Sequence, residues 1–273
     1  MLKTRVITAL VLVSFLLPSL FWLSQPAWAL LVAVFIGIAA WEWGALLGRK
    51  PSSRIVLGML GGATCAGLSL LDPAALEFSL GSAWMVVAYG LSAAFWLVLM
   101  PFWLRSKWAI GGVSGLLVGA VVLIPTWLAM VQLRALGAVA LLGIFAVVWM
   151  ADIAAYFSGR AFGKHKLAPT ISPGKTWEGA IGAGVGVVVY GLVVRQIFDI
   201  QVLSLALWII LLLVVTGVSI VGDLFESLLK RKAGIKDSSN ILPGHGGVLD
   251  RIDSLTSTLP VVALFLLLLQ RSA

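Results

Sequence analysis

The feature that most constrains this chain is a series of long apolar segments separated by short polar stretches. Only 11% of its 273 residues are charged and 61% are hydrophobic, whereas an average soluble domain has about 25% charged residues. A soluble chain with so few charges could not cover its surface, but lipid solvates an apolar exterior. The composition therefore predicts an integral membrane protein.

Nine segments approach the roughly 20 apolar residues that a membrane-spanning helix needs. They cover residues 6–23, 27–47, 55–71, 83–104, 108–131, 135–157, 178–198, 202–227 and 255–270. We therefore expect an all-α, polytopic membrane protein with about nine transmembrane helices. The basic start and Ala27-Trp28-Ala29 imitate a signal peptide, but the next apolar segment follows at once, which favours an uncleaved first helix.

The positions of the basic residues predict the orientation of these helices. With a cytoplasmic N-terminus, 16 of the 19 lysines and arginines lie on the cytoplasmic side, and only Arg134, Arg195 and Arg271 lie outside. This asymmetry is typical of membrane proteins. We expect a cytoplasmic N-terminus and an outer C-terminus. The net charge of +8 then reflects membrane orientation, and no nucleic-acid partner is expected.

Ionisable residues at membrane depth concentrate in the second half of the chain, and such residues are costly unless they serve a function. We expect residues 1–134 to form a scaffold of N-terminal helices with possible dimer contacts. Residues 135–273 are expected to carry a catalytic site that faces the cytoplasm.

A first polar cluster precedes the seventh segment and reads Ser172-Pro-Gly-Lys175-Thr176-Trp-Glu-Gly179. Its Gly-Lys-Thr triplet is not a P-loop, because Pro169 stands where that motif needs glycine and no strand is expected before it. The turn could present free backbone N–H groups and Lys175 to an anionic ligand. It could equally be a helix cap with a snorkelling lysine.

A second cluster spans the end of the eighth segment and the start of the ninth. Four of its side chains recur at helical spacing on one face: Asp223, Glu226, Ser227 and Lys230. Glu226 and Lys230 could simply pair with each other. Asp250 and Asp253 share a face at the next segment, and the intervening loop is rich in glycine. Asp223 and Asp250 could therefore converge on Mg²⁺, which takes one or two carboxylates together with substrate oxygens.

The second cluster resembles the signature of the phosphatidate cytidylyltransferases. The residues that carry the resemblance are Ser227, Lys230, Arg231, Lys236, Asp237 and Pro243-Gly-His245-Gly246-Gly247-Val-Leu-Asp250-Arg251-Ile-Asp253. The first cluster is similar to that family too. The resemblance implies a homodimeric enzyme of the bacterial inner membrane. Its expected reaction converts CTP and phosphatidic acid to CDP-diacylglycerol and pyrophosphate, with Mg²⁺ and with K⁺ at the metal site.

In such a reaction the lipid phosphate is already anionic, so cations and positioning matter more than a general base. The catalytic candidates are Asp223, Asp250, Asp253 and Arg251, of which Asp223 and Asp250 are the expected metal ligands. The substrate-binding candidates are Ser172, Lys175, Thr176, Lys230, Arg231, Lys236, His245, Gly246 and Gly247.

Two other readings use the same residues. A polyprenol kinase or an archaeal-type lipid cytidylyltransferase would share the nucleotide and differ in the acceptor. An ion-coupled transporter could use Asp152 and Asp223, but transporters commonly show repeated halves, and no such repeat is visible in this sequence.

Overall fold

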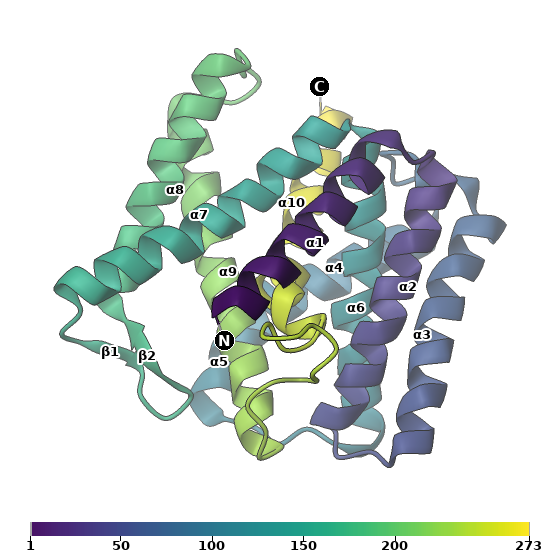
Figure 1. The fold of residues 1–273 in the computed structure, drawn as a ribbon. Coiled ribbons are helices and arrows are strands. Elements are labelled where there is room, and N and C mark those ends of the chain that lie inside the picture. Colours follow the sequence, from purple (N-terminus) through teal and green to yellow (C-terminus); the bar gives the residue numbers. More distant parts are fainter. Residues whose placement is uncertain (1, 273) are drawn as a thin grey trace.

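The computed structural model describes residues 2–272 as a bundle of long helices (Figure 1). Within those residues, nine helical segments are long and apolar enough to cross a membrane. Their bounds are α1 Leu2–Trp22, α2 Gln25–Leu46, α3 Pro51–Leu71, α4 Ala83–Ala94 with α5 Met100–Ser106, α6 Gly112–Ala135, α7 Ala138–Phe162, α8 Trp177–Ile197, α9 Leu205–Lys232 and α10 Leu249–Ser272. A π-helical turn at Phe95–Leu99 joins α4 to α5, and a 3₁₀ turn at Pro73–Leu76 follows α3. The predicted all-α polytopic fold is confirmed.

The helix ends that carry charge extend beyond the segments predicted from hydropathy. Helix α9 continues to Lys232 instead of ending at residue 227, and α10 begins at Leu249 instead of at residue 255. A hydropathy pattern ends where the charges begin, although the helices continue. Asp250 and Asp253 consequently lie in the first turns of α10, where the helix N-terminus favours acidic side chains.

A short hairpin, which the sequence analysis did not predict, connects α7 to α8. Strand β1 (Lys166–Ala168) pairs antiparallel with β2 (Ser172–Thr176). The last residue of β2 is also the N-cap of α8, where Thr176 Oγ1 accepts a hydrogen bond from Gly179 N at 3.1 Å. The hairpin thus sets the position of Lys175 directly before a transmembrane helix.

Helices α6 and α10 lie in the interior of the bundle, surrounded by α2, α4, α7 and α9 (Figure 1). Trp127 of α6 is fully buried, and its Nε1 donates to the carbonyl oxygen of Ala29 at 3.0 Å. Thr126 Oγ1 donates to the carbonyl oxygen of Thr256 in α10 at 3.3 Å. The second contact holds α10, which carries two of the predicted catalytic acids, against α6.

Helices α7 and α8 form a closely packed pair at one side of the molecule (Figure 1). A Cβ atom at Gly182 would lie 2.0 Å from Ser158 Oγ, and one at Gly186 would lie 2.5 Å from Ala154 Cβ. Gly182 and Gly186, four residues apart on α8, therefore allow close helix packing within the chain.

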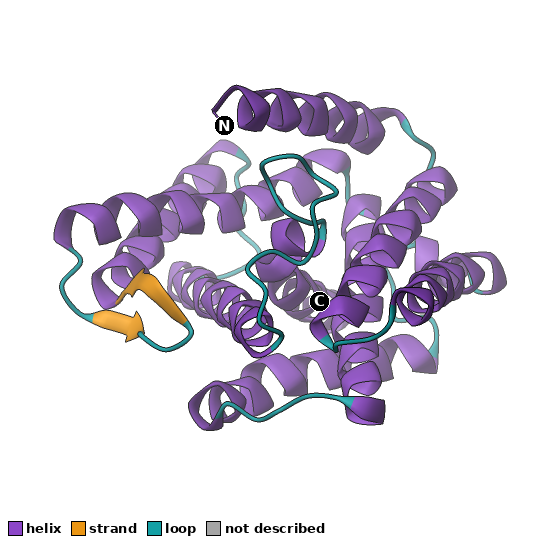
Figure 2. Ribbon diagram, turned by 60° about the horizontal axis from the view of Figure 1, so that its bottom comes forward, coloured by secondary structure: helices purple, strands orange, loops and turns teal. Residues whose placement is uncertain are grey.

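The β-hairpin and the loop between α9 and α10 lie at the same end of the molecule. Figure 2 turns that end toward the viewer and shows the orange hairpin at the edge and the loop near the centre. Figure 1 shows the N-terminus of the chain toward this end and its C-terminus at the opposite end. The orientation of either end relative to a membrane stays a prediction.

Candidate active site

One face of α9 carries the polar side chains that the helical spacing predicted. Asp223 Oδ2 lies 2.5 Å from Lys175 Nζ of β2, and Asp223 Oδ1 accepts a hydrogen bond from Ser227 Oγ at 3.2 Å. One turn later, Glu226 Oε1 lies 3.4 Å from Lys230 Nζ. The predicted common face is present, and so is the Glu226–Lys230 pair that the spacing allowed.

A cavity of about 470 Å³ opens between α7, the hairpin, α8 and α9. Its polar lining consists of Asp152, Tyr156, Arg160, Ser172, Lys175, Thr176, Ser219 and Asp223. Its remaining wall is largely apolar and includes Ala151, Leu167 and Ile220. A cavity with paired charges beside an apolar wall, between helices of membrane-spanning length, suits a ligand that has both a charged group and hydrocarbon.

Asp250 lies in the first turn of α10 with only 7% of its surface exposed. Its Oδ1 lies 2.7 Å from Lys230 Nζ, which links α10 to α9. Its Oδ2 accepts three hydrogen bonds, from Ser238 N and Ser238 Oγ at 2.9 Å and from Gly247 N at 2.8 Å. Asp250 therefore organises the loop before α10, and its Oδ1 is the oxygen that faces α9.

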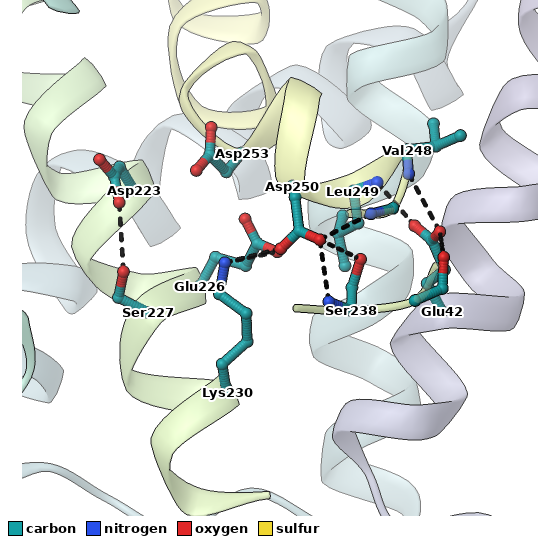
Figure 3. A network of polar contacts seen from close by, with 12 residues as sticks. Glu42, Asp223, Glu226, Ser227, Lys230, Ser238, Val248, Leu249, Asp250 and Asp253 are labelled. Atoms are coloured by element: carbon teal, nitrogen blue, oxygen red, sulfur yellow. Dashed lines mark hydrogen bonds and ion pairs between the residues drawn. The ribbon is translucent and has the colours of Figure 1, made fainter. Parts of the chain in front are cut away.

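Asp253 projects from α10 between Asp223 and Asp250 in Figure 3. It is half-buried and accepts a hydrogen bond from Ser254 N at 2.6 Å. Glu226 is buried beside these acids, with 4% of its surface exposed. Two of these acids thus lie on the last turns of α9 and two on the first turns of α10, and Lys230 lies between Glu226 and Asp250.

The glycines of the loop before α10 allow close approach to these carboxyl groups. Gly246 has φ +83°, and a Cβ atom there would lie 2.5 Å from Asp250 Oδ2. At Gly247 a Cβ would lie 2.1 Å from Ser238 Oγ. The Nδ1 atom of His245 is buried and has no hydrogen-bond partner among the described residues. The sequence assigned these three residues to substrate binding, and the structure adds packing of the loop as a second role for both glycines.

Two of the predicted basic residues form ion pairs with acids of the site, and three others lie around it. Lys175 lines the cavity and Lys230 joins the two helices, as described above. Arg231 Nε donates to the carbonyl oxygen of Ile171 at 3.4 Å, which ties the end of α9 to the hairpin. Lys236 and Arg251 are exposed. Ser172 and Thr176 both line the cavity, and Thr176 is also the buried N-cap of α8.

Glu42 of α2 also makes polar contacts with this region, although the sequence analysis gave it no role in the site. It is 0% exposed, and its two carboxyl oxygens accept hydrogen bonds from Val248 N at 3.0 Å and Leu249 N at 2.6 Å (Figure 3). Its position as an acid inside an otherwise apolar segment was the available signal, since intramembrane acids are rare without a partner.

The acids of this region offer carboxylate oxygens, which are the ligand type that a hard cation takes. No three Asp, Glu, His or Cys side chains within residues 2–272 are grouped as a ready-made metal cage. Mg²⁺ is commonly held by one or two carboxylates together with substrate phosphates, so a cage is not required. Both carboxyl oxygens of Glu226 are buried and make no hydrogen bond within the described part of the chain, although Oε1 lies 3.4 Å from Lys230 Nζ. The Asp223 side chain is 28% exposed at the cavity.

Comparisons with known proteins cover nearly the whole chain. The model of the cytidylyltransferase family matches residues 3–269. A phosphatidate cytidylyltransferase of Pseudomonas aeruginosa is 39% identical over 276 aligned residues, which cover 97% of each chain. The Haemophilus influenzae protein of the same name is 36% identical over 97% of this chain and 98% of its own length. One from Brucella suis is 50% identical over 45% of this chain and 44% of its own. The chain therefore belongs to the cytidylyltransferase family.

Proposed function

We propose that this protein is a phosphatidate cytidylyltransferase, which transfers a cytidylyl group from CTP to phosphatidic acid. The family membership and the names of relatives that align over nearly the full chain support this activity. The products are CDP-diacylglycerol and pyrophosphate. The observation that carries the proposal for the site is the cavity in which Lys175 and Asp223 face an apolar wall.

In the proposed reaction an oxygen of the phosphatidate phosphate attacks the α-phosphorus of CTP. The bond from the α-phosphorus to the bridging oxygen breaks, and pyrophosphate leaves with the electron pair. The attacking phosphate is anionic at neutral pH, so no side chain has to remove a proton. The chain must instead bring two anions together and hold them in line.

The side chains around the cavity match that task. Lys175 and Arg160 would bind the lipid phosphate, and the apolar wall would continue into the acyl chains. The exposed Arg251 and Lys236, together with Arg231, would contact the nucleotide phosphates, since a guanidinium can grip two oxygens at once. Lys175 would exchange its contact with Asp223 for the incoming phosphate.

Mg²⁺ is proposed as the cofactor, with Asp223 and Asp250 as its protein ligands and Asp253 beside them. When bound, it would neutralise charge that develops on the leaving pyrophosphate. Glu226, whose buried Oε2 has no hydrogen-bond partner within the described residues, offers an oxygen ligand for a second cation, for which K⁺ is the proposal.

We also propose the cellular setting. The basic residues favour a site that faces the cytoplasm, with a cytoplasmic N-terminus and an outer C-terminus. The relatives are bacterial proteins, which supports a location in the inner membrane as a multi-pass protein. A homodimer belongs to the same proposal.

The deciding experiment supplies the purified protein in nanodiscs with CTP labelled at the α- or the γ-phosphorus. Phosphatidic acid or a polyprenol serves as the acceptor. Cytidylyl transfer to phosphatidic acid moves the α-label into the lipid and releases the γ-label as pyrophosphate. A γ-label in the polyprenol would identify a kinase and overturn the proposal, and so would the absence of any labelled lipid.

A further inference from the structure

We infer that Glu42 of α2 is a positioning residue of the active site, which fixes the start of α10 and thereby orients Asp250. The inference rests on the proposed function for the role of Asp250 in the active site. The contacts of Glu42 do not depend on that function. It gives the N-terminal half of the chain a part in the reaction, although that half supplies none of the predicted catalytic residues.

The carboxyl group of Glu42 contacts three donors, all of which lie in or beside the loop before α10. Oε1 accepts from Ser239 Oγ at 2.6 Å and from Val248 N at 3.0 Å, and Oε2 accepts from Leu249 N at 2.6 Å. These partners are 197 to 207 residues away in the sequence. A side chain of one transmembrane helix thus caps the N-terminus of another.

The start of α10 needs this partner because its own acid is occupied elsewhere. The first N–H groups of a helix have no partner within the helix, and a nearby side chain usually accepts from them. Asp250 directs its Oδ2 to Ser238 and Gly247 instead. Val248 and Leu249 are buried, so without Glu42 their N–H groups would lack both water and an acceptor.

Glu42 and Asp250 together hold the loop from two sides. Asp250 binds Ser238, and Glu42 binds the next residue, Ser239. Gly247 lies where the two carboxyl groups approach, and a Cβ atom there would be 2.3 Å from Glu42 Oε1. Because Gly247 has no side chain, both Glu42 and Ser238 have room to approach the loop. Release of Glu42 would free the segment immediately before Asp250.

The test is Glu42→Gln in nanodiscs, which keeps the size of the side chain but turns an amide NH₂ group toward N–H and O–H donors. Two readouts are taken far below the melting temperature. Hydrogen exchange of the peptide covering residues 238–250 is measured without metal. Binding of Mn²⁺, used as a paramagnetic probe in place of Mg²⁺, is followed by electron paramagnetic resonance without substrates.

We expect exchange in this peptide to accelerate about tenfold or more and the Mn²⁺ dissociation constant to rise about tenfold, as when a partner of a metal ligand is lost. The matched control is Glu77→Gln, a change at an exposed glutamate after α3, which should alter neither readout. A lower melting temperature with unchanged exchange and Mn²⁺ affinity would show that Glu42 serves stability alone and would overturn the inference.

Two further comparisons keep the test decisive. Should Glu42→Gln not fold, Ser239→Ala removes one of the three contacts, and the same readouts should shift in the same direction by a smaller factor. Unchanged readouts in Ser239→Ala would then count against the inference. Should the unaltered protein bind no Mn²⁺, the proposed metal site fails, and loop exchange alone decides the role of Glu42.

Discussion

Replacing Lys230 with methionine removes the cation that lies between two buried acids. Lys230 Nζ is 2.7 Å from Asp250 Oδ1 and 3.4 Å from Glu226 Oε1, and the lysine side chain is 14% exposed. Removing one partner of a buried ion pair costs about 3–5 kcal/mol, because the remaining charge is left uncompensated. Asp250 keeps three other donors, so we expect the lower end, about 3 kcal/mol.

The assay is thermal unfolding of the detergent-solubilised protein. Chains of 150–250 residues lose about 2–4 °C per kcal/mol, so Lys230→Met should melt at least about 6 °C lower than the unaltered protein. Adding Glu226→Gln should recover part of the loss, because it removes one of the unpaired charges. The exposed Lys164→Met serves as the control and should melt normally. A shift below about 2 °C in Lys230→Met would refute the view that this lysine compensates buried carboxylates.

Three further predictions follow from the packing, the charge pattern and the exposed arginine. Gly182→Ala places a Cβ 2.3 Å from Ser158 Cβ and should lower the free energy of unfolding by about 1–3 kcal/mol. Gly217→Ala meets nothing within 4 Å and should raise that free energy by about 0.5–1 kcal/mol. Equal melting temperatures would contradict the packing of α7 on α8. Reporter fusions after Arg134 and Gln196 should report the outer side and one after Lys166 the cytoplasm, while a cytoplasmic C-terminus would refute the orientation. Arg251→Ala should lower turnover more than tenfold, about 1.4 kcal/mol of transition-state stabilisation, and near-normal kinetics in a folded variant would remove it from the site.

The membrane-spanning architecture was predictable because hydropathy alone determines it. Each apolar segment became a helix, and the spacing from Asp223 to Lys230 gave the polar face of α9 correctly. The β-hairpin was not predictable, since strand β2 contains Pro173 and Gly174 and lacks the alternation of a typical strand.

The partners of the acids were harder to predict than the acids themselves. Lys175 and Asp223 were both assigned to the site, but their pairing depends on how the hairpin packs on α9. The contact of Glu42 with the start of α10 spans about 200 residues, and no local pattern encodes it. The role of Asp250 as a metal ligand stays a prediction, but the three hydrogen bonds that its Oδ2 accepts were not predicted.

The most direct test of the central claim is turnover of Asp223→Asn with α-labelled CTP and phosphatidic acid across a range of Mg²⁺ concentrations. Asp223 is preferable to Asp250 here, because Asp250 also holds Ser238 and Gly247 and its loss would disturb the loop. Asparagine keeps the size and one acceptor oxygen but loses the charge that binds a hard cation. The account predicts a folded protein that transfers no label to lipid. Transfer at the unaltered rate with unchanged Mg²⁺ dependence would contradict it.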